Sequence, residues 1–442
     1  MVAVVRRWFG ENVGGLPRAF WHLWLATLVN RLGGFIVIYL AVYLVVVREF
    51  APSFAGLVVG LYGAGAALGV LVGGVLADRW GRRPTMISAQ LAAAVVAVAL
   101  GLVTAGPAIA LLTSLLGALT QAARPAMSAM MTDVVADGDR LRAFSLNYWA
   151  INLGFAGAAL LAGVLAGLDY RLLFFLDAAT TALGALVVFR IPETRPRVTP
   201  QARPRDAAVP AGQSPPAGRS RPGGIGAVLA DRVFLGLVGT TLLTWMIVET
   251  LSMMPIAMRS DDLPLSSYGA VIAVNGILIV LGQLFVPRLV RGSDRSRTLA
   301  LAAVFIGVGF GTVAVADQIW VYAVSVAIWT VGEMLMSPSN SSLIADLAPA
   351  ALRGRYNGVF SLGFSVASFA APVLAGLTMQ YSGEATLWIG CLVLGLVAAG
   401  LQYVAGPARE RRVAVLRAAE VEAVATSRDG AAAPPRPEPA AA

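Results

Sequence analysis

Residues 53–83 read SFAGLVVGLYGAGAALGVLVGGVLADRWGRR, an apolar run that ends abruptly in the charged turn DRWGRR at 78–83. The apolar part, 54–77, is long enough to cross a bilayer, which takes about 20 residues of α-helix. Its glycines leave bare backbone where a second helix can approach closely. The stretch therefore predicts a membrane-spanning helix followed by a short basic loop.

The rest of the chain has the same character. Of its 442 residues, 58% are hydrophobic and 13% are charged, whereas a soluble domain carries about 25% charged residues. This excess cannot form one soluble core, because such cores stop growing near ~250–300 residues. The composition excludes a cytosolic enzyme and a disordered scaffold, and it predicts an all-α integral membrane protein. Roughly twelve runs reach spanning length, and they cover residues 20–47, 54–77, 85–105, 108–131, 142–166, 170–189, 233–257, 267–290, 299–316, 319–345, 355–380 and 385–405.

The basic residues, all 33 of them arginine, mark one side of the predicted bundle. They gather in alternate connections: the N-terminus, 78–83, 137–142, 190–232, 288–297, 353–355 and the C-terminal tail. Only Arg48, Arg171 and Arg259 stand on the other side. By the positive-inside rule the arginine-rich side is cytoplasmic, with both termini inside. Topology thus accounts for the net charge of +9, and nucleic-acid binding is not needed to explain it.

Residues 191–230 interrupt the pattern with Pro, Arg, Gly and Ser, which indicates a flexible linker that separates six spans from six. The start of the tail, Arg409–Val424, fits either a basic amphipathic helix on the membrane face or a solvated tail. The first span lacks a small-residue cleavage site, so we interpret it as a retained anchor. The expected organisation is a cytoplasmic N-terminus 1–18, a six-helix bundle 19–190, the linker 191–230, a second bundle 231–406 and a cytoplasmic tail 407–442.

The two halves repeat each other without gaps when residue 133 is laid on residue 346. Matches of Pro, Asp, Arg and Gly at equivalent loop and helix-end positions rarely arise by chance. They pair Gly56 with Gly269, Gly63 with Gly276, Gly69 with Gly282, Arg82 with Arg295, Pro125 with Pro338, Asp133 with Asp346, Arg140 with Arg353 and Gly163 with Gly376. Two parallel six-helix halves are the repeat structure of major facilitator transporters, which place the substrate site between the halves near the midplane.

The stretch 74–83 also resembles the loop motif of that superfamily, G-x-x-x-D-R-x-G-R-R, at every defining position. The motif residues are Gly74, Asp78, Arg79, Gly81, Arg82 and Arg83. The resemblance implies that Asp78 pairs with the start of helix eleven and that Arg82 pairs with Asp133, as a cytoplasmic latch that stabilises the outward-open state. The second-half copy carries Arg291 in place of Asp78, so the latch is expected to be asymmetric. The alternative is that these arginines only mark topology.

Four ionisable residues, Arg31, Asp177, Glu249 and Glu333, lie deep within spans, where charges are costly and usually functional. Glu249 and Glu333 stand about 14 residues, or roughly 21 Å, into their helices. A carboxyl group withdrawn from water favours its protonated form, so both could bind and release protons. Arg31 could bind an anion or form a structural ion pair with Asp177 or another buried acid. A structural role is the alternative for each acid.

A closer resemblance concerns twelve-helix multidrug:proton antiporters. The segment 332–338, GEMLMSP, resembles their helix ten, and 146–152, LNYWAIN, resembles their helix five. Asn147 stands where a similar antiporter has Asp, and Asn cannot titrate. Their helix-five glycine signature is partial here, because Ala158 and Ala159 replace Gly-Pro. The helix-one signature of peptide transporters is absent, which makes peptide uptake less favoured.

These features predict a transporter, not an enzyme, in a prokaryotic inner membrane. We expect a functional monomer that exports amphipathic molecules by alternating access, with a proton gradient as energy source and no cofactor. The chain has no Lys for an ATP phosphate loop, and Cys391 and His22 are too few for a disulfide or metal site. The alternatives are a proton-coupled importer of a small solute and a lipid-handling or sensor protein. Residues expected to line the cavity, unless they only pack, are Tyr39, Asn147, Tyr148, Asn152, Trp245, Met253 and Trp329.

Overall fold

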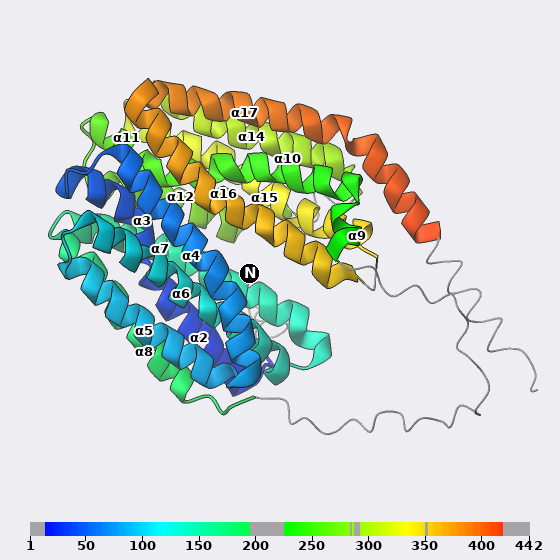
Figure 1. The fold of residues 1–442 in the computed structure, drawn as a ribbon, viewed down its shortest axis with the longest axis horizontal. Helices are drawn as coiled ribbons and strands as arrows, with labels where there is room; N and C mark the ends of the chain where they lie inside the picture. Colours follow the sequence, from blue (N-terminus) through cyan, green and yellow to red (C-terminus); the bar gives the residue numbers. More distant parts are fainter. Residues whose placement is uncertain (1–13, 195–224, 283–284, 287–291, 350–351, 419–442) are drawn as a thin grey trace, which may run out of the picture.

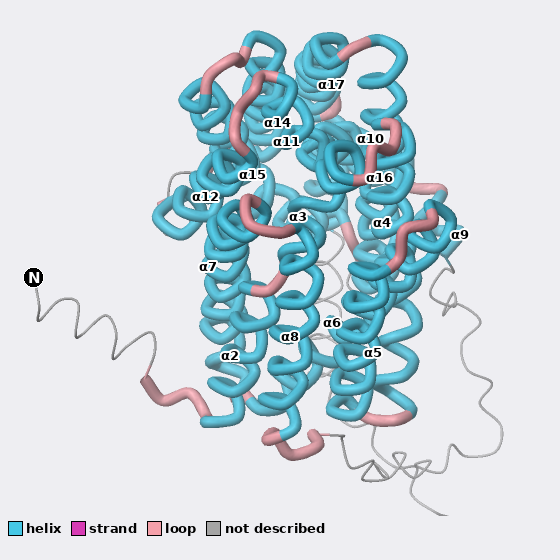
Figure 2. The backbone as a smooth tube through the Cα atoms, turned by 90° about the vertical axis from the view of Figure 1, so that its left-hand side faces the viewer, coloured by secondary structure: helices cyan, strands magenta, loops and turns pink. Residues whose placement is uncertain are grey.

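The protein is described here by a computed structural model, which covers residues 14–194, 225–282, 285–286, 292–349 and 352–418. Within these ranges all regular secondary structure is helical, as the tube drawing shows (Figure 2). Twelve helices are long and apolar enough to cross a membrane. The predicted class, an all-α protein with twelve spans, is therefore confirmed. The predicted features at 1–13, 195–224, Arg291 and 419–442 lie outside the described residues.

The first six spans form the lower part of the view in Figure 1 and the last six the upper part. The N-terminal spans are α2–α3–η1 (Arg18–Val47), α4 (Pro52–Arg79), α5 (Arg82–Leu102), α6 (Gly106–Val134), α7 (Arg140–Ala166) and α8 (Tyr170–Phe189). The C-terminal spans are α10–η3–α11 (Arg232–Ser260), α12 (Leu265–Gly282), α14 (Arg295–Thr312), α15 (Ile319–Leu347), α16 (Arg353–Ser382) and α17 (Glu384–Val404). Most observed ends fall within a few residues of the predicted ones.

The first span departs from the prediction of one continuous helix over 20–47. It consists of α2 (Arg18–Leu32), α3 (Phe35–Val42) and a π-helical turn, η1 (Tyr43–Val47). The break falls at Gly33 and Gly34. A Cβ atom at Gly33 would collide with the hydroxyl group of Thr180 on α8, so only glycine lets the two helices meet there. Backbone groups freed inside a bilayer need partners within the protein.

Two segments outside the spans are also helical. The predicted linker ends in a short helix, α9 (Ile225–Leu229), whose Val228 is buried against the C-terminal half. After α17, residues 406–418 form a helix that we call the tail helix. The tail is therefore helical as far as residue 418, whereas its placement on the membrane face stays a prediction.

Two equivalent helix pairs join the halves: α4 with α16, and α7 with α12. A Cβ atom added at Gly56 would meet the Pro372 carbonyl oxygen and come within 3.1 Å of Cα of Gly376. At Gly269 it would meet the carbonyl oxygen of Ala159 and come within 3.3 Å of Cα of Gly163. These two contacts are related by the same offset that relates the sequence halves. The internal repeat therefore places backbone against backbone at two symmetric points.

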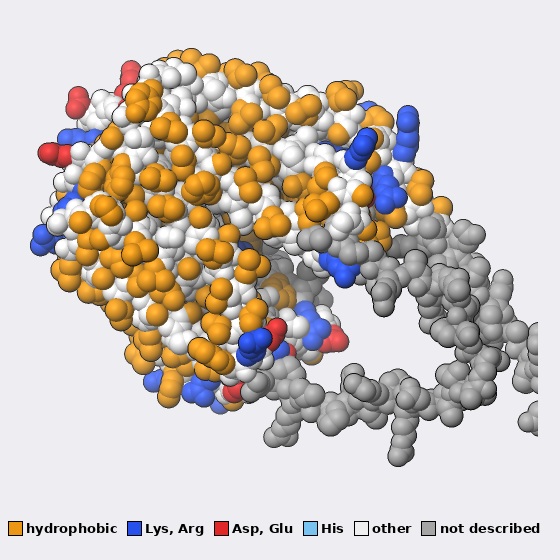
Figure 3. Space-filling model, in the orientation of Figure 1, with side chains coloured by type: hydrophobic (Ala, Val, Ile, Leu, Met, Phe, Trp, Pro, Cys, Tyr) orange, Lys and Arg blue, Asp and Glu red, His pale blue; other side chains and the backbone are white. Residues whose placement is uncertain are grey.

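All these contacts lie at one end of the molecule. On α4 they involve Gly56, Gly60 and Gly63, close to its start. Toward the arginine-rich end, a Cβ atom at Gly74 or at Gly354 would have no neighbour within 4 Å. The halves meet at the opposite end and diverge at the arginine-rich end, on the right of Figure 1. Figure 3 shows hydrophobic side chains over most of the flank and charged ones near the ends.

We predict that Gly269→Val opens the end where the halves now meet. Overpacking a close contact costs about 1–3 kcal/mol, so the population of the present arrangement relative to its alternative should fall about tenfold. Spin labels at residues 104 and 318, in a Cys391→Ala background, would report longer distances by pulsed electron resonance. Gly390→Val is the matched control, because a Cβ atom there has no neighbour within 4 Å. Equal distance distributions in both variants would contradict the role of this contact.

Candidate functional site

Glu333 lies within α15 and is tied to a neighbouring helix. The side-chain amide of Asn275, on α12, donates a 3.0 Å hydrogen bond to Oε2 of Glu333. The same amide donates to the Thr330 hydroxyl at 3.1 Å. Thr330 and Glu333 are three residues apart and so share one helix face. Asn275 directly precedes Gly276, where a Cβ atom would come within 2.5 Å of Cβ of Ala156 on α7. The acid is thus one residue removed from a contact between the halves.

Glu249 has an equivalent relation to the other contact between the halves. It ends α10, where the α-helical hydrogen bonding gives way to the 3-10 turn η3 (Thr250–Met253). Its carboxyl group interacts with the side chain of Ser368 on α16. A Cβ atom at Gly63 on α4 would come within 3.0 Å of Cβ of Ser368. Both acids therefore interact with a helix at or next to a point where that helix meets the other half.

Asp177, on α8, accepts hydrogen bonds at the break in the first span. Its Oδ2 accepts a 3.2 Å hydrogen bond from the backbone N–H of Ile36, in the first turn of α3. Its Oδ1 accepts from the hydroxyl of Thr181 at 3.4 Å, and Asn30 donates to Thr181 at 3.4 Å. A carboxylate is favourable at a helix N-terminus, where free N–H groups carry partial positive charge. The Asp177 carboxylate therefore caps the N-terminus of α3, the helix that follows the break.

Arg31 stands just before the same break and interacts electrostatically with Tyr62 and Arg124. The ion pair with Asp177, one of its two predicted roles, does not form among the described residues. A Cβ atom at Gly154 on α7 would come within 2.5 Å of Cβ of Arg31, so α7 packs closely beside it. The N-terminal half thus presents two cations, Arg31 and Arg124, and the C-terminal half presents two acids.

At the arginine-rich end, Nη1 of Arg82 lies 3.2 Å from Oδ2 of Asp133. The repeat-related residues Arg295 and Asp346 form an ion pair as well. The predicted pairing of Asp78 with helix eleven is absent in this arrangement, because α4 and α16 diverge at that end. Asp78 has an exposed side chain and makes no hydrogen bond or ion pair within the described ranges. One part of the latch is thus formed and the other is open.

Glu193 also belongs to this loop, although the motif did not select it. Its two carboxylate oxygens accept 3.0 Å hydrogen bonds from the backbone N–H groups of Arg82 and Arg83. Both groups lie in the first turn of α5. Gly81, with φ at +111°, lets the chain turn there, and a Cβ atom on it would come within 2.9 Å of Oε2 of Glu193. The predicted linker includes Glu193, and an acid directly after span six was the signal that could have singled it out.

The predicted cavity residues divide into two groups. Tyr148 is 36% exposed and interacts electrostatically with Glu333, and Asn152 donates to its backbone carbonyl at 2.9 Å. Trp245 packs edge-on against Phe360 and Phe364. Tyr148 and Asn152, both on α7, thus lie beside residues of the C-terminal half, Glu333 and Gly276. Oδ1 of Asn147, from the same segment of α7, is buried and has no hydrogen-bond partner in the part of the chain that the structure describes.

The cavity prediction is wrong for three residues in this arrangement, Tyr39, Met253 and Trp329, because all three are buried in the core. Trp329 packs on Phe310 with 5.5 Å between ring centroids. The hydroxyl of Tyr39 donates to the carbonyl of Leu265 at 3.0 Å, across the contact between the halves. These side chains pack helices together, and in this arrangement they do not face open space. Within the described ranges no group of three or more His, Cys, Asp or Glu could hold a metal ion.

We predict that Glu193→Gln destabilises the protein by about 1 kcal/mol. The substitution removes the negative charge that faces the N-terminus of α5, while the amide oxygen can accept only part of the same hydrogen bonding. The expected readout is a lower midpoint of thermal unfolding in detergent. Glu49→Gln is the control, because Glu49 is exposed and makes no hydrogen bond or ion pair within the described ranges. Equal midpoints for the two variants would remove Glu193 from the loop structure.

Known proteins resemble this chain over most of its length. A sequence profile described as the Major Facilitator Superfamily matches residues 23–372 and, in a second match, 263–428. The chain is 26% identical to the multidrug resistance protein MdtH of Aeromonas hydrophila, across 85% of this chain and 92% of the relative. It is 24% identical to a Na(+), Li(+), K(+)/H(+) antiporter of Planococcus maritimus, across 78% of this chain and 85% of that protein.

Solved structures agree in fold. The peptide transporter POT in complex with sulfate superposes with a TM-score of 0.68 at 19% identity, over 89% of this chain and 96% of that one. The nucleoside transporter NupG gives a TM-score of 0.70 at 14% identity, over 90% of this chain and 99% of that one. At these identities the likeness concerns the fold alone.

Proposed function

Because the chain belongs to the Major Facilitator Superfamily and is a multi-pass secondary transporter, we propose that it exports amphipathic, cationic molecules in exchange for protons. The observation that carries the proposal is the pair of membrane-embedded acids: Glu333 accepts a hydrogen bond from α12, and Glu249 interacts with Ser368 on α16, and both helices join the halves. The similarity to MdtH, a multidrug resistance protein, supports export of this substrate class.

Protonation of either acid would act directly on a contact between the halves. An ionised carboxylate accepts a stronger hydrogen bond than a neutral carboxyl group does. When Glu333 gains a proton, its bond from Asn275 weakens, and Asn275 adjoins the contact at Gly276. When Glu249 gains a proton, its carboxyl group can donate a hydrogen bond as well as accept one, so its interaction with the Ser368 hydroxyl changes. Each proton therefore changes how firmly the halves are held together at the end opposite the arginines.

The alternative state would close the arginine-rich end. Helices α4 and α16 run antiparallel, with Gly56 against Gly376. In the same register Gly74 comes opposite Gly358, and both now have open space beside them. Rocking the halves would bring these glycines together and carry Asp78 to the N-terminus of α16, which favours negative charge. The latch would then hold the outward-open state, with the arginine-rich end on the cytoplasmic side.

The acids also suit a cationic substrate. A positively charged molecule can replace a proton beside a carboxylate, so that proton and substrate compete for one site. The aromatic group of Trp245, Phe360 and Phe364, on α10 and α16, offers ring faces and edges to an apolar body. Such a surface accepts molecules of varied shape, since few of its contacts are directional. Competition between proton and substrate produces exchange without any further coupling device.

We predict that Glu333→Gln abolishes transport driven by a pH gradient, because glutamine cannot release a proton. Liposomes that contain the purified protein would be loaded with a fluorescent lipophilic cation. The movement of the cation would be followed after a pH jump. Glu249→Gln should reduce the rate at least about tenfold, which corresponds to ~1.4 kcal/mol of lost coupling. The control is Glu384→Gln at the start of α17, where the carboxylate accepts a hydrogen bond from Ser260 and contacts neither Asn275 nor Ser368. Undiminished gradient-driven flux in Glu333→Gln would remove Glu333 from the mechanism.

The sign of the flux separates export from import. Exchange moves the substrate against the proton, whereas accumulation in the same direction as the proton would show an importer. Lipid scrambling without any substrate counterflow would show a lipid-handling protein. Each result is read from the same liposomes, with the acid variants as controls.

Monovalent cation/proton exchange is a second candidate, favoured by the similarity to the Planococcus antiporter. Glu333 has Thr330 and Asn275 beside it, and Glu249 has Ser368, and such oxygen-bearing side chains suit hard cations. In the same liposomes, added Na⁺ or K⁺ would collapse the pH gradient without any organic cation. Exchange of Na⁺ or K⁺ that the organic cation does not inhibit would favour this candidate over drug export.

A further inference from the structure

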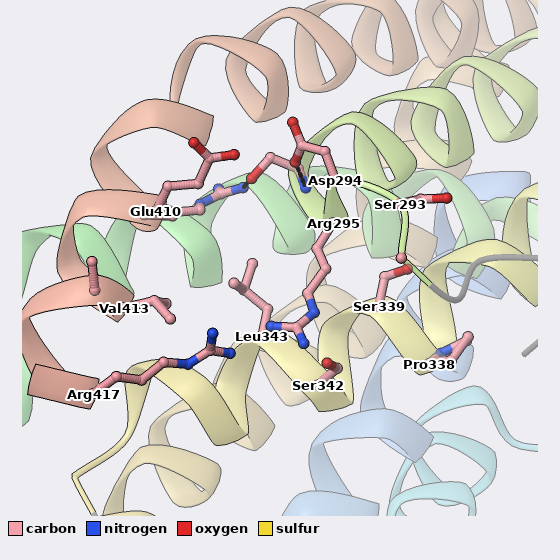
Figure 4. A pocket seen from close by; sticks show the side chains of 14 residues that line it. Ser293, Asp294, Arg295, Pro338, Ser339, Ser342, Leu343, Glu410, Val413 and Arg417 are labelled. Atoms are coloured by element: carbon pink, nitrogen blue, oxygen red, sulfur yellow. Dashed lines mark hydrogen bonds between the residues drawn. The ribbon is translucent and has the colours of Figure 1, made fainter. Parts of the chain in front are cut away.

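A cavity of about 620 Å³ opens at the arginine-rich end of the C-terminal half, away from the acids described above. It lies between the start of α14, the last third of α15 and the tail helix (Figure 4). Three arginines line it, Arg295, Arg409 and Arg417, together with the hydroxyl-bearing residues Ser293, Ser296, Ser339 and Ser342. Nothing in the proposed transport cycle uses this cavity.

Arg409 is the unusual member of the set. Its side chain is 1% exposed, yet no carboxylate contacts it within the described ranges. Its two terminal nitrogens donate to Gln402 at 2.6 Å, to Thr240 at 3.1 Å and to Ser296 at 3.5 Å. Its Nε has no hydrogen-bond partner among the described residues. Burial lowers the pKa of the guanidinium to about 10, so it is still charged near neutral pH. A buried charge facing only neutral groups is destabilised unless an anion approaches.

The other two arginines share a single acid. Arg295 pairs with Asp346, and Nη2 of Arg417 lies 3.4 Å from the same carboxylate. One carboxylate compensates only one of the two guanidinium groups. Figure 4 shows the side chains of Arg295 and Arg417 extending to the same side of the cavity as Ser342. Paired guanidinium groups with hydroxyl groups beside them match the oxygens of a phosphate.

Two acids at the rim have to be counted as well. Asp294 accepts from the backbone N–H groups of Ser296 and Arg297 and pairs with the Arg297 side chain at 3.1 Å, so its charge is compensated locally. Glu410 is exposed, and in Figure 4 it lies on the opposite side from Arg295 and Arg417. Four arginines (295, 297, 409, 417) therefore face three acids (294, 346, 410), which leaves one positive charge in excess.

We propose that this cavity binds a phosphate group, with Arg295 and Arg417 contacting its oxygens and the buried Arg409 supplying the compensating charge behind them. The phosphate could belong to a phospholipid headgroup, since the cavity lies where two spans end, or to a soluble organic phosphate. Binding would tie the tail helix to α14 and α15 and so brace this end of the C-terminal half. The site is independent of the proposed transport chemistry.

The test uses the full chain in detergent, with thermal unfolding followed at constant ionic strength. Dioleoyl phosphatidic acid is titrated beside dioleoylglycerol, which has the same chains but no phosphate. Glycerol 3-phosphate and inorganic phosphate form the soluble arm. Phosphatidic acid should raise the unfolding midpoint saturably while dioleoylglycerol should not. Equal half-saturation by glycerol 3-phosphate would assign the site to a soluble phosphate, and a much weaker effect would assign it to a lipid.

Arg417→Gln should raise the half-saturating concentration of phosphatidic acid about tenfold. Its side chain is 63% exposed, so folding should survive the change. Arg411→Gln is the matched control, because it removes the same charge from the same helix but does not line the cavity. Glu410→Gln should tighten binding, and Ser342→Asp should abolish it by placing a negative charge inside. Equal weakening in Arg411→Gln and Arg417→Gln, or no stabilisation by any phosphate, would overturn the proposal.

Discussion

Close approach of backbones at Gly56 and Gly269 is the constraint on which the rest of the structure depends. Inside a bilayer there is little hydrophobic gain in bringing two helices together, because lipid chains are as apolar as leucine. The two halves are held by close packing, which is possible only where side chains are missing. Both glycines face a carbonyl oxygen on the partner helix. Any larger residue would push the halves apart at the end where they now meet.

This constraint explains the placement of the ionisable residues. A carboxyl group far from the contacts could titrate without consequence for the arrangement of the halves. Glu333 instead accepts a hydrogen bond from Asn275, and Glu249 interacts with Ser368. Both partners lie at or next to the two contacts. Asp177 has a different task, because it compensates the N–H groups freed where the first span breaks. The same chemical group, a carboxyl group, thus stabilises a local break in one half and lies near the junction of the halves in the other.

Hydropathy and the repeat predicted the twelve spans, because spanning length and apolar composition are both properties of short sequence windows. The Arg82–Asp133 pair was implied by the resemblance of the loop motif, whereas the pair of the repeat-related residues Arg295 and Asp346 was not predicted. The break at Gly33 was not predicted, although the paired glycines Gly33 and Gly34 were a signal for it. The side chain that requires glycine there, Thr180, lies far away in sequence. Burial of Trp329 and Met253 was also hidden. A helix that is apolar all round gives no indication of which face meets lipid and which meets protein.

The repeat is retained where backbones meet and at the Arg–Asp pairs of the arginine-rich end, and it is lost at the charges deep within the spans. At the offset that relates Gly56 to Gly269, Glu333 corresponds to Thr120 and Glu249 to Ile36, while Arg31 corresponds to Thr244 and Asp177 to Gly390. The two arrangements of a rocking transporter need symmetric contacts, so that neither half opposes the motion of the other. Coupling needs the reverse, because equal acids in both halves would titrate alike and favour no direction. A symmetric scaffold with charges confined to different positions in each half meets both requirements.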